Sequence, residues 1–351
     1  MPIFERNHVR QLLAFLVAAS IIAVGLMGGM SGCAKTAVKE EEGGEASEER
    51  GGNGTERVAG VTGIAFVRDD HVYLAKADGT EERRLTSTPA GYGDLAFSPS
   101  GGKLAATKVE GDAMPQLVVI ETASGKVSDV SWTNPEYSQA WTSADVLPWF
   151  GGIGWAGEDL LYCTGMRSRN DTMTLMVLKY DLAAHAVEVI ELDAQNPAVS
   201  PDGKKLAFIR KPADWAESQG RGWQSGEYGD LTVRDLESGN LRMVAFNVFR
   251  AAFSPAGELM ALAVYEEPDT VLKITDLEGK RIHTLFATGP GGIIGQISFS
   301  PAGDQILSCH GMREVVGEPP RHELFAVPAN QDNAPLKNLG WGSDPSWSPA
   351  R

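Results

Sequence analysis

The segment Val199-Ser200-Pro201-Asp202-Gly203 contains the phrase that decides the fold of this 351-residue chain. The phrase recurs with an aromatic or aliphatic first residue at Phe97, Trp155, Val199, Phe253, Phe299 and Trp347. The copy at Trp155 is degenerate, and successive first residues are 58, 44, 54, 46 and 48 positions apart. A period of about 40–50 residues built of short strands is typical of a β-propeller, whose repeats are four-stranded blades.

Each copy predicts a tight turn between two strands. Proline fixes φ at the first turn position and glycine supplies a left-handed conformation, so the chain folds back on itself. An alternating run follows the turn, as in Lys205-Leu-Ala-Phe-Ile. Two further strands are expected after it, for example Leu231–Asp235 and Leu241–Ala245, which makes four strands in each unit.

The strand before each copy is expected to be the innermost strand of its blade. The residue just before the first motif position is small in every copy: Ala96, Gly154, Ala198, Ala252, Ser298 and Ser346. Small residues suit the place where wedge-shaped blades converge on a common axis. Six copies therefore predict six blades.

The two ends of the repeat region are expected to pair with each other. Strands over Ile64–Arg68, His71–Ala75 and Glu82–Leu85 precede the first motif, and Gly342–Pro349 supplies one inner strand at the end. Joining them completes a blade and removes an open sheet edge. We therefore predict an all-β, six-bladed propeller over residues 58–351. Its four-stranded antiparallel blades are closed by pairing of the C-terminal inner strand with the N-terminal strands.

The repeat resembles that of the TolB-type, WD-repeat-like propellers. The resemblance rests on the Ser-Pro-Asp-Gly phrase and on Tyr73-Leu-Ala-Lys-Ala-Asp-Gly-Thr-Glu-Glu-Arg-Arg-Leu-Thr86, and it covers about residues 60–351. It implies the fold and says little about activity, because one fold hosts many functions. TolB carries a further N-terminal domain where this chain has a polar segment, so TolB's partners are not carried over.

The first 32 residues read as a lipoprotein signal peptide. Arg6 and Arg10 precede an apolar stretch from Leu12 to Met27, and Met30-Ser31-Gly32-Cys33 then resembles the bacterial lipobox. The resemblance implies a diacylglyceryl group on Cys33 and a lipid-anchored, extracytoplasmic protein of the bacterial cell envelope. The alternative is an uncleaved membrane helix from Gln11 to Met30.

Residues 33–57 are expected to comprise the lipidated cysteine and, over residues 34–57, a disordered acidic tether. This stretch contains hardly any large apolar residue and cannot bury enough surface to fold. The net charge of the whole chain is −15, which argues against nucleic-acid partners. Cys163 and Cys309 fall in blades half a ring apart and should be buried free thiols. We expect no cofactor, no metal and a monomeric propeller.

The long insertions are expected on one face of the propeller, which we call the loop face. They are Ser131–Gly151, Met166–Thr172, Lys211–Gly229 and His310–Arg321. The motif turns lie on the opposite face, which we call the turn face. Long loops on a rigid scaffold commonly carry function.

Two of these insertions are rich in aromatic residues: Trp132, Tyr137, Trp141, Trp149 and Phe150 in one, and Trp215, Trp223 and Tyr228 in the other. Exposed Trp and Tyr are common anchors of protein and ligand interfaces. The alternative is that they pack as small cores that hold their own loops together.

A polar ring is expected at the loop-face mouth of the central channel. Three residues before each motif position stand Asp94, Gly152, Asn196, Arg250, Gln296 and Asp344. Such a ring could bind a cation or the end of a peptide. The alternative is a set of solvated residues where each strand begins.

The chain lacks the motifs of common propeller-associated enzymes. There is no G-x-S-x-G nucleophile elbow, no zinc-protease helix motif and no phosphate loop. We therefore predict a non-catalytic recognition or scaffold protein that binds a protein, peptide or envelope glycan through its loop face. The alternative is a small hydrolase or lyase at the channel mouth, with or without a metal.

Overall fold

The computed structural model describes residues 63–111, 113–130, 146–169, 172–212, 228–290, 292–312 and 322–349. Within these ranges the chain forms 23 β-strands and no helix. It follows that no described segment is a helix long and apolar enough to cross a bilayer. The predicted signal peptide, Cys33 and the tether to residue 57 lie outside the described residues.

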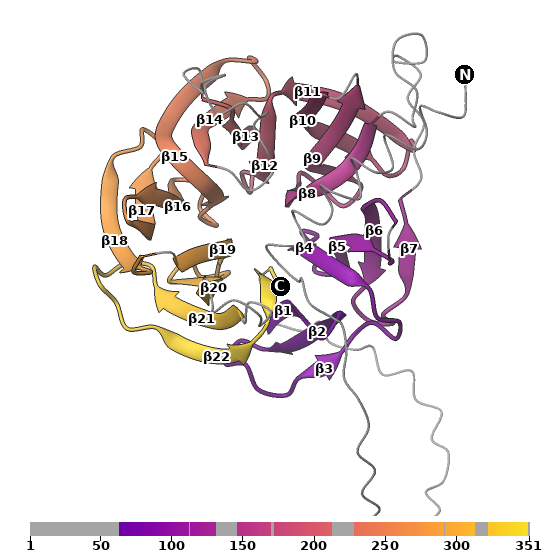
Figure 1. The fold of residues 1–351 in the computed structure, drawn as a ribbon, viewed down its shortest axis with the longest axis horizontal. Helices are drawn as coiled ribbons and strands as arrows, with labels where there is room; N and C mark the ends of the chain where they lie inside the picture. The colour runs from indigo at the N-terminus through magenta and orange to yellow at the C-terminus, as the bar shows by residue number, and fades with distance from the viewer. Residues whose placement is uncertain are drawn as a thin grey trace, which may run out of the picture.

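The strands pair antiparallel in five sheets that surround a common centre (Figure 1). One sheet contains, in order, β23 (Ser343–Trp347), β1 (Gly63–Arg68), β2 (His71–Lys76) and β3 (Arg83–Arg84). The next contains β4 (Gly91–Phe97), β5 (Lys103–Val109), β6 (Gln116–Glu121) and β7 (Val127–Asp129). A third contains β8 (Val146–Trp155), β9 (Leu160–Arg169), β10 (Thr172–Asp181) and β11 (Ala186–Leu192). Another contains β19 (Gly292–Phe299), β20 (Gln305–Met312), β21 (His322–Pro328) and β22 (Lys337–Trp341).

The fifth sheet has seven strands, which differs from the expected four. It contains β12 (Ala194–Val199), β13 (Lys205–Arg210), β14 (Gly229–Asp235), β15 (Leu241–Phe253), β16 (Leu259–Glu266), β17 (Asp269–Asp276) and β18 (Arg281–Ala287). The first half of β15 pairs with β14 and the second half pairs with β16. The sequence predicted a strand ending at Ala245 and a separate inner strand after it. Only a few residues separate the two, and Asn247, with φ of 55°, redirects the chain without ending the strand.

The two ends of the described chain pair as predicted. Ile64 lies opposite Trp347 in the antiparallel pair β1–β23. The Gly63 amide donates to Ser348 Oγ at 2.9 Å, and the Ser348 amide donates to the Gly63 carbonyl at 2.9 Å. The Trp347 side chain is buried with Ile64 and Phe66 in one apolar cluster. This pairing places residue 63 beside the last motif turn, on the turn face.

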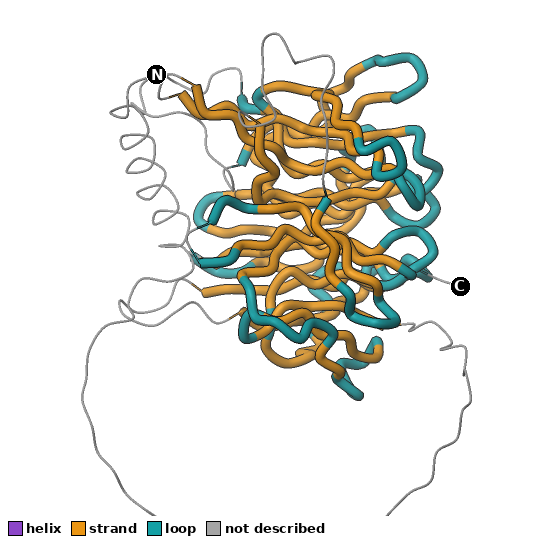
Figure 2. The backbone as a smooth tube through the Cα atoms, turned by 90° about the vertical axis from the view of Figure 1, so that its right-hand side faces the viewer, coloured by secondary structure: helices purple, strands orange, loops and turns teal. Residues whose placement is uncertain are grey.

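The motif turns fold as their residue types predict. Gly203 has φ of 70°, and the Ser200 hydroxyl accepts the Lys205 amide at 2.8 Å, which fixes the turn. The serines of the copies at Phe97, Phe253 and Phe299 accept equivalent bonds. Figure 2 shows loops and turns collected at the two faces of the molecule, with strands between them.

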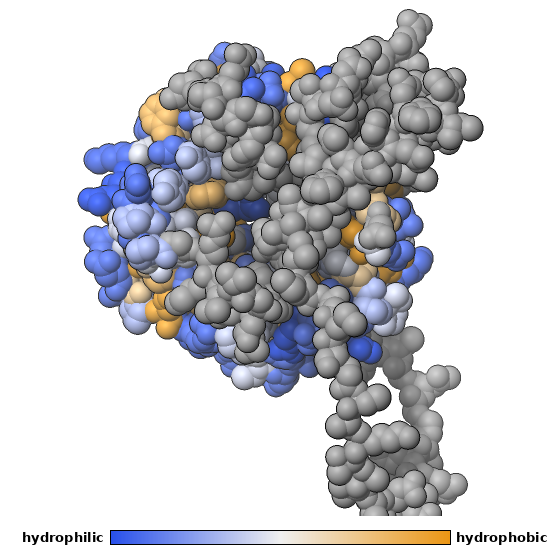
Figure 3. Space-filling view, in the orientation of Figure 1, coloured by the Kyte–Doolittle hydropathy of each residue, from blue (hydrophilic) through white to orange (hydrophobic). Residues whose placement is uncertain are grey.

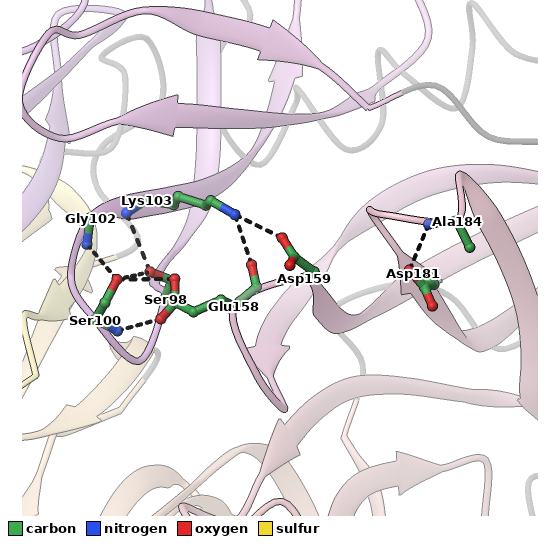
Figure 4. Close-up of polar contacts among 8 residues, drawn as sticks. All are labelled: Ser98, Ser100, Gly102, Lys103, Glu158, Asp159, Asp181 and Ala184. Atoms are coloured by element: carbon green, nitrogen blue, oxygen red, sulfur yellow. Dashed lines mark hydrogen bonds and ion pairs between the residues drawn. The ribbon is translucent and has the colours of Figure 1, made fainter.

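The degenerate copy at Trp155 joins two sheets. Figure 4 shows Lys103 of β5 reaching the turn between β8 and β9, where its Nζ lies 2.9 Å from Asp159 Oδ1. The Glu158 carboxylate accepts the Ser100 amide at 2.6 Å and the Ser100 hydroxyl at 3.0 Å. This contact connects the first motif turn to the neighbouring sheet.

Three expected loops are shorter than the sequence indicated. Strand β8 begins at Val146, inside the insertion expected to run to Gly151. Strand β9 continues to Arg169 and β10 begins at Thr172, so most of the insertion expected over Met166–Thr172 is strand. His310, expected to begin another insertion, lies within β20. The strands are longer because their backbones continue to pair beyond the expected strand ends. In the β8–β9 pair, for example, Val146 lies opposite Arg167.

Candidate functional site

The predicted polar ring lies on the six inner strands, β4, β8, β12, β15, β19 and β23, close to the centre in Figure 1. Four of its six positions have a left-handed backbone. Their φ values are 53° at Asp94, 84° at Gly152, 55° at Asn196 and 50° at Asp344. Asp, Asn and Gly are the residue types that adopt this conformation most readily. Backbone conformation therefore explains the residue type at these positions.

Asp94 connects two sheets through a carboxylate that accepts three hydrogen bonds. Its Oδ1 accepts the Gly152 amide at 2.9 Å, and its Oδ2 accepts the Gly151 amide at 3.0 Å and the Thr107 hydroxyl at 3.2 Å. The glycines belong to β8 of the neighbouring sheet, and Asp94 is only 3% exposed. With three donors in place, this carboxylate holds the inner strands together.

Asp344 and Asn196 make similar contacts with the next inner strand. Asp344 Oδ1 accepts the Asp94 amide at 3.2 Å, and Asn196 Nδ2 donates to the Phe249 carbonyl at 2.6 Å. Gln296 reaches further, because its Nε2 donates to the Leu95 carbonyl of β4 at 2.5 Å. Since β23 lies between β19 and β4 in Figure 1, this bond joins two inner strands that are not direct neighbours.

Burial changes the ionisation of three groups near the ring. Burial and the neighbouring Asp94 carboxylate raise the pKa of Asp344 above its ordinary value. Burial raises the pKa of the Cys309 thiol to about 12 and raises that of Cys163 further. Both cysteines are buried free thiols, as the sequence predicted.

Two threonines in this region were not found from the sequence. The Thr164 hydroxyl accepts the Asn196 amide at 2.9 Å and donates to the Gly151 carbonyl, while Thr107 donates to Asp94. Both side chains are buried on second strands, β9 and β5. The sequence argument counted positions back from each motif, which covers only the inner strands. It therefore gave no indication of Thr107 and Thr164 on the second strands.

Among the predicted loop aromatics, Tyr228 is the one whose side chain the structure describes. Its ring stacks on Tyr265, with centroids 5.4 Å apart and planes 12° apart, and contacts the Phe249 ring edge-on at 5.8 Å. Tyr228 remains 36% exposed. Trp132, Tyr137, Trp141, Trp215 and Trp223 lie outside the described residues. Trp149 and Phe150 belong to β8, but their side chains are not described.

The aromatic cluster of Tyr228, Tyr265 and Phe249 adjoins the polar ring. Phe249 precedes Arg250, and its carbonyl accepts bonds from Asn196 Nδ2 and from Arg250 Nη1 at 3.3 Å. Tyr228 precedes β14 and Tyr265 lies at the end of β16, so the cluster stands on the loop face. The described part of the chain contains no group of three or more His, Cys, Asp or Glu side chains able to hold a metal ion.

No protein-family model and no curated protein sequence matches this chain. Solved structures do match. TolB from Acinetobacter baumannii is 17% identical with a TM-score of 0.60, over 83% of this chain and 68% of that one. A putative TolB from Agrobacterium tumefaciens is 15% identical with a TM-score of 0.55, over 81% and 92% of the two chains. This chain has a TolB-type propeller fold.

This chain also resembles solved structures of other proteins. A chain of a nidogen/laminin complex is 9% identical with a TM-score of 0.55, covering 82% of this chain and 98% of that one. Puromycin hydrolase is 12% identical with a TM-score of 0.50, and the match spans 81% of this chain and 53% of the hydrolase. At such identities the likeness concerns the fold alone. A function must be argued from the residues of this TolB-type propeller itself.

Proposed function

We propose that this protein is an extracytoplasmic, lipid-anchored recognition protein that binds a protein, peptide or envelope glycan through its loop face. The aromatic cluster of Tyr228, Tyr265 and Phe249 carries the proposal. It offers a partly exposed tyrosine held rigid by stacking, beside polar groups at the centre of the propeller. Rigid aromatic anchors next to hydrogen-bonding groups are the usual composition of recognition surfaces.

The scaffold of this proposal is a closed propeller of six blades. The seven-stranded sheet counts as two blades that share β15, and each of the other four sheets counts as one. The pairing of β1 with β23 supports closure. A non-catalytic role is supported by Asp94, because its carboxylate is occupied by three donors and is poorly placed to act as a base.

The anchor would hold the turn face toward the membrane. Residue 63 lies beside the turn of Ser348, so a tether ending at residue 57 approaches the propeller from that face. A 24-residue flexible tether spans typically about 25–30 Å. The loop face would then point away from the lipid surface, toward envelope partners.

The anchor is tested by replacing Cys33 with serine. We expect the wild-type chain in the membrane fraction, labelled by palmitate, because two or more acyl chains anchor a protein stably. The Cys33→Ser variant should lose the label and should not be processed at residue 32. Cys163→Ser is the matched control, since this buried thiol lies in the propeller. Equal labelling of the Cys33→Ser variant and the wild type would overturn the anchor.

Recognition is tested at Tyr228. We expect Tyr228→Ala to reduce capture of envelope components by the full chain about tenfold or more, because truncated aromatic anchors commonly cost over 1–2 kcal/mol. Ile282→Ala is the control, since Ile282 is 42% exposed near the start of the outer strand β18, on the turn face and away from the cluster. The measurement is quantitative cross-linking in mild detergent, with thermal unfolding to verify the fold.

The loop tryptophans extend the same test. A variant with alanine at Trp141, Trp215 and Trp223 should lose the same cross-linked components as Tyr228→Ala. If both variants capture them as well as the wild type does, loop-face recognition is wrong. Selective loss in the Ile282→Ala control would move the binding surface to the outer strands on the turn face.

A further inference from the structure

The centre of the propeller contains a cavity of about 470 Å³ between the inner strands. Its lining extends from motif prolines, such as Pro201 and Pro301, to the level of Arg250 and Gln296. Because the motif prolines lie in turns on the turn face, the cavity reaches that face, and its other end lies at the polar ring next to the aromatic cluster. The described residues visible on the face drawn in Figure 3 are largely hydrophilic with scattered apolar ones.

Arg250 is the one charged side chain among the residues that line this cavity. The lining includes neither Asp94 nor Asp344. The guanidinium makes one hydrogen bond to a described residue, at 3.3 Å to the Phe249 carbonyl, and no ion pair with a described carboxylate. The Arg250 charge also interacts electrostatically with the buried Asp344 carboxylate. As the one charged side chain of the lining, Arg250 makes an anion the favoured ligand of this cavity.

The walls of the cavity suit a slender apolar chain that also carries polar groups. Phe253, Phe299 and Trp347 are each 8% exposed and border it together with the motif prolines. Serine hydroxyls interrupt this apolar surface, at Ser298 and Ser346 among others. Rings and hydroxyls in alternation match an extended peptide better than a pure hydrocarbon chain, because a peptide must pair its amides.

Gln296 determines how far such a chain can enter. Its side chain joins β19 to β4 by donating to the Leu95 carbonyl at 2.5 Å, and Gln296 occupies the same position on its inner strand as Arg250 does on β15. A peptide that enters from the turn face therefore meets the side-chain amide of Gln296 and the guanidinium of Arg250 together. This arrangement favours recognition of a chain end over passage of a continuous chain.

We propose that the turn-face opening of the channel binds the free C-terminal carboxylate of an extended, apolar peptide segment, with Arg250 as its ionic partner. The forked donors of a guanidinium match the two oxygens of a carboxylate. The peptide would enter from the face opposite the proposed recognition surface, while Arg250 lies at the inner end of the cavity, in the polar ring beside the aromatic cluster. The inference does not rest on binding through the aromatic cluster. Each proposal can fail without the other.

The test compares two peptides with the full chain in maltoside micelles. The probe is fluorescein-labelled at its N-terminus, has the sequence Ala-Pro-Ala-Val-Ala, and ends in a free carboxylate or in a carboxamide. We expect saturable binding by fluorescence anisotropy, with the amide about tenfold weaker, because the carboxamide cannot form the charge-assisted hydrogen bonds that a carboxylate forms with the guanidinium. Arg250→Met should reduce affinity for the acid to that for the amide.

Arg242→Met is the matched control for the arginine substitution. Arg242 lies in the same strand, exposed and paired with Glu278 at 3.0 Å, so its loss should leave peptide binding unchanged. The proposal is overturned by equal affinity for acid and amide, by no saturable binding of either, or by full binding to Arg250→Met. Displacement of the probe by decanoate at far lower concentration than by the unlabelled peptide would assign the site to fatty acids and also overturn it. If Arg250→Met fails to fold, Arg250→Lys and the wild-type comparison of the two peptides decide the question.

Discussion

Replacing Trp347 with alanine is expected to lower the free energy of unfolding by about 3–5 kcal/mol. Trp347 is 8% exposed and lies opposite Ile64 in the pair that joins the two ends of the described chain. Its ring packs in one cluster with Ile64, Phe66 and Leu307, from both sides of that junction. Truncation leaves a cavity there and weakens the one pair that covers the edge of β1.

The measurement is thermal unfolding followed by circular dichroism, where we expect a fall of about 5–10 °C. Trp341→Ala is the matched control, because Trp341 lies six positions earlier, in β22, and is 48% exposed. It should change stability by about 1 kcal/mol or less. Equal losses of stability in the two variants would mean that the β1–β23 junction stabilises the fold no more than an exposed position does. The closed propeller would then be wrong.

The repeat was predictable because its turn chemistry is local. Proline and glycine at fixed offsets determine the turn whatever packs around it, so the positions of Ser200 and Gly203 were sufficient to place the hairpins. The pairing of β1 with β23 followed from counting strands within one blade. Both inferences use the chain's own periodicity and need no knowledge of contacts between distant residues.

The seven-stranded sheet could not be predicted in the same way. Whether β15 continues past Ala245 or breaks depends on pairing with two different partners, β14 and β16, and the local sequence is compatible with both. The extensions of β8 and β9 have the same origin, since each strand is stabilised by the other. Strand ends set by non-local pairing are not encoded in residue type.

The sequence located the residues of the polar ring, but it suggested only ligand binding as the reason for their polar residue types. Asp94, Asn196 and Asp344 were considered as ligands because they are polar and near a channel. Their left-handed φ angles and their bonds to the next inner strand give a second reason for the same residue types. Arg250, which lacks that conformation and lines the cavity, is the position where a ligand explains more than the backbone does.

Asp94 distinguishes these two explanations most sharply. We expect Asp94→Ala to lower the free energy of unfolding by about 3–5 kcal/mol, because it leaves buried donors without a partner. Two of these donors are the amides of Gly151 and Gly152, whose own strand packs on that of Asp94 across a sheet boundary. Both glycines have positive φ, 141° and 84°, a bend that the carboxylate helps to hold.

The control is Asp235→Ala. The Asp235 carboxylate also accepts three bonds, from the amides of Glu237 and Ser238 and from the Ser238 hydroxyl, but in an exposed outer hairpin. Solvent can replace it there, so its loss should cost about 1 kcal/mol. Urea unfolding measures both variants. If Asp94→Ala is as stable as Asp235→Ala, the hydrogen bonds from the Gly151 and Gly152 amides are not needed for stability. Asp94 would then again be a candidate for binding a ligand. If the large loss is found, the inner strands depend on this carboxylate for their mutual packing, and a search for ligands should begin at Arg250 instead.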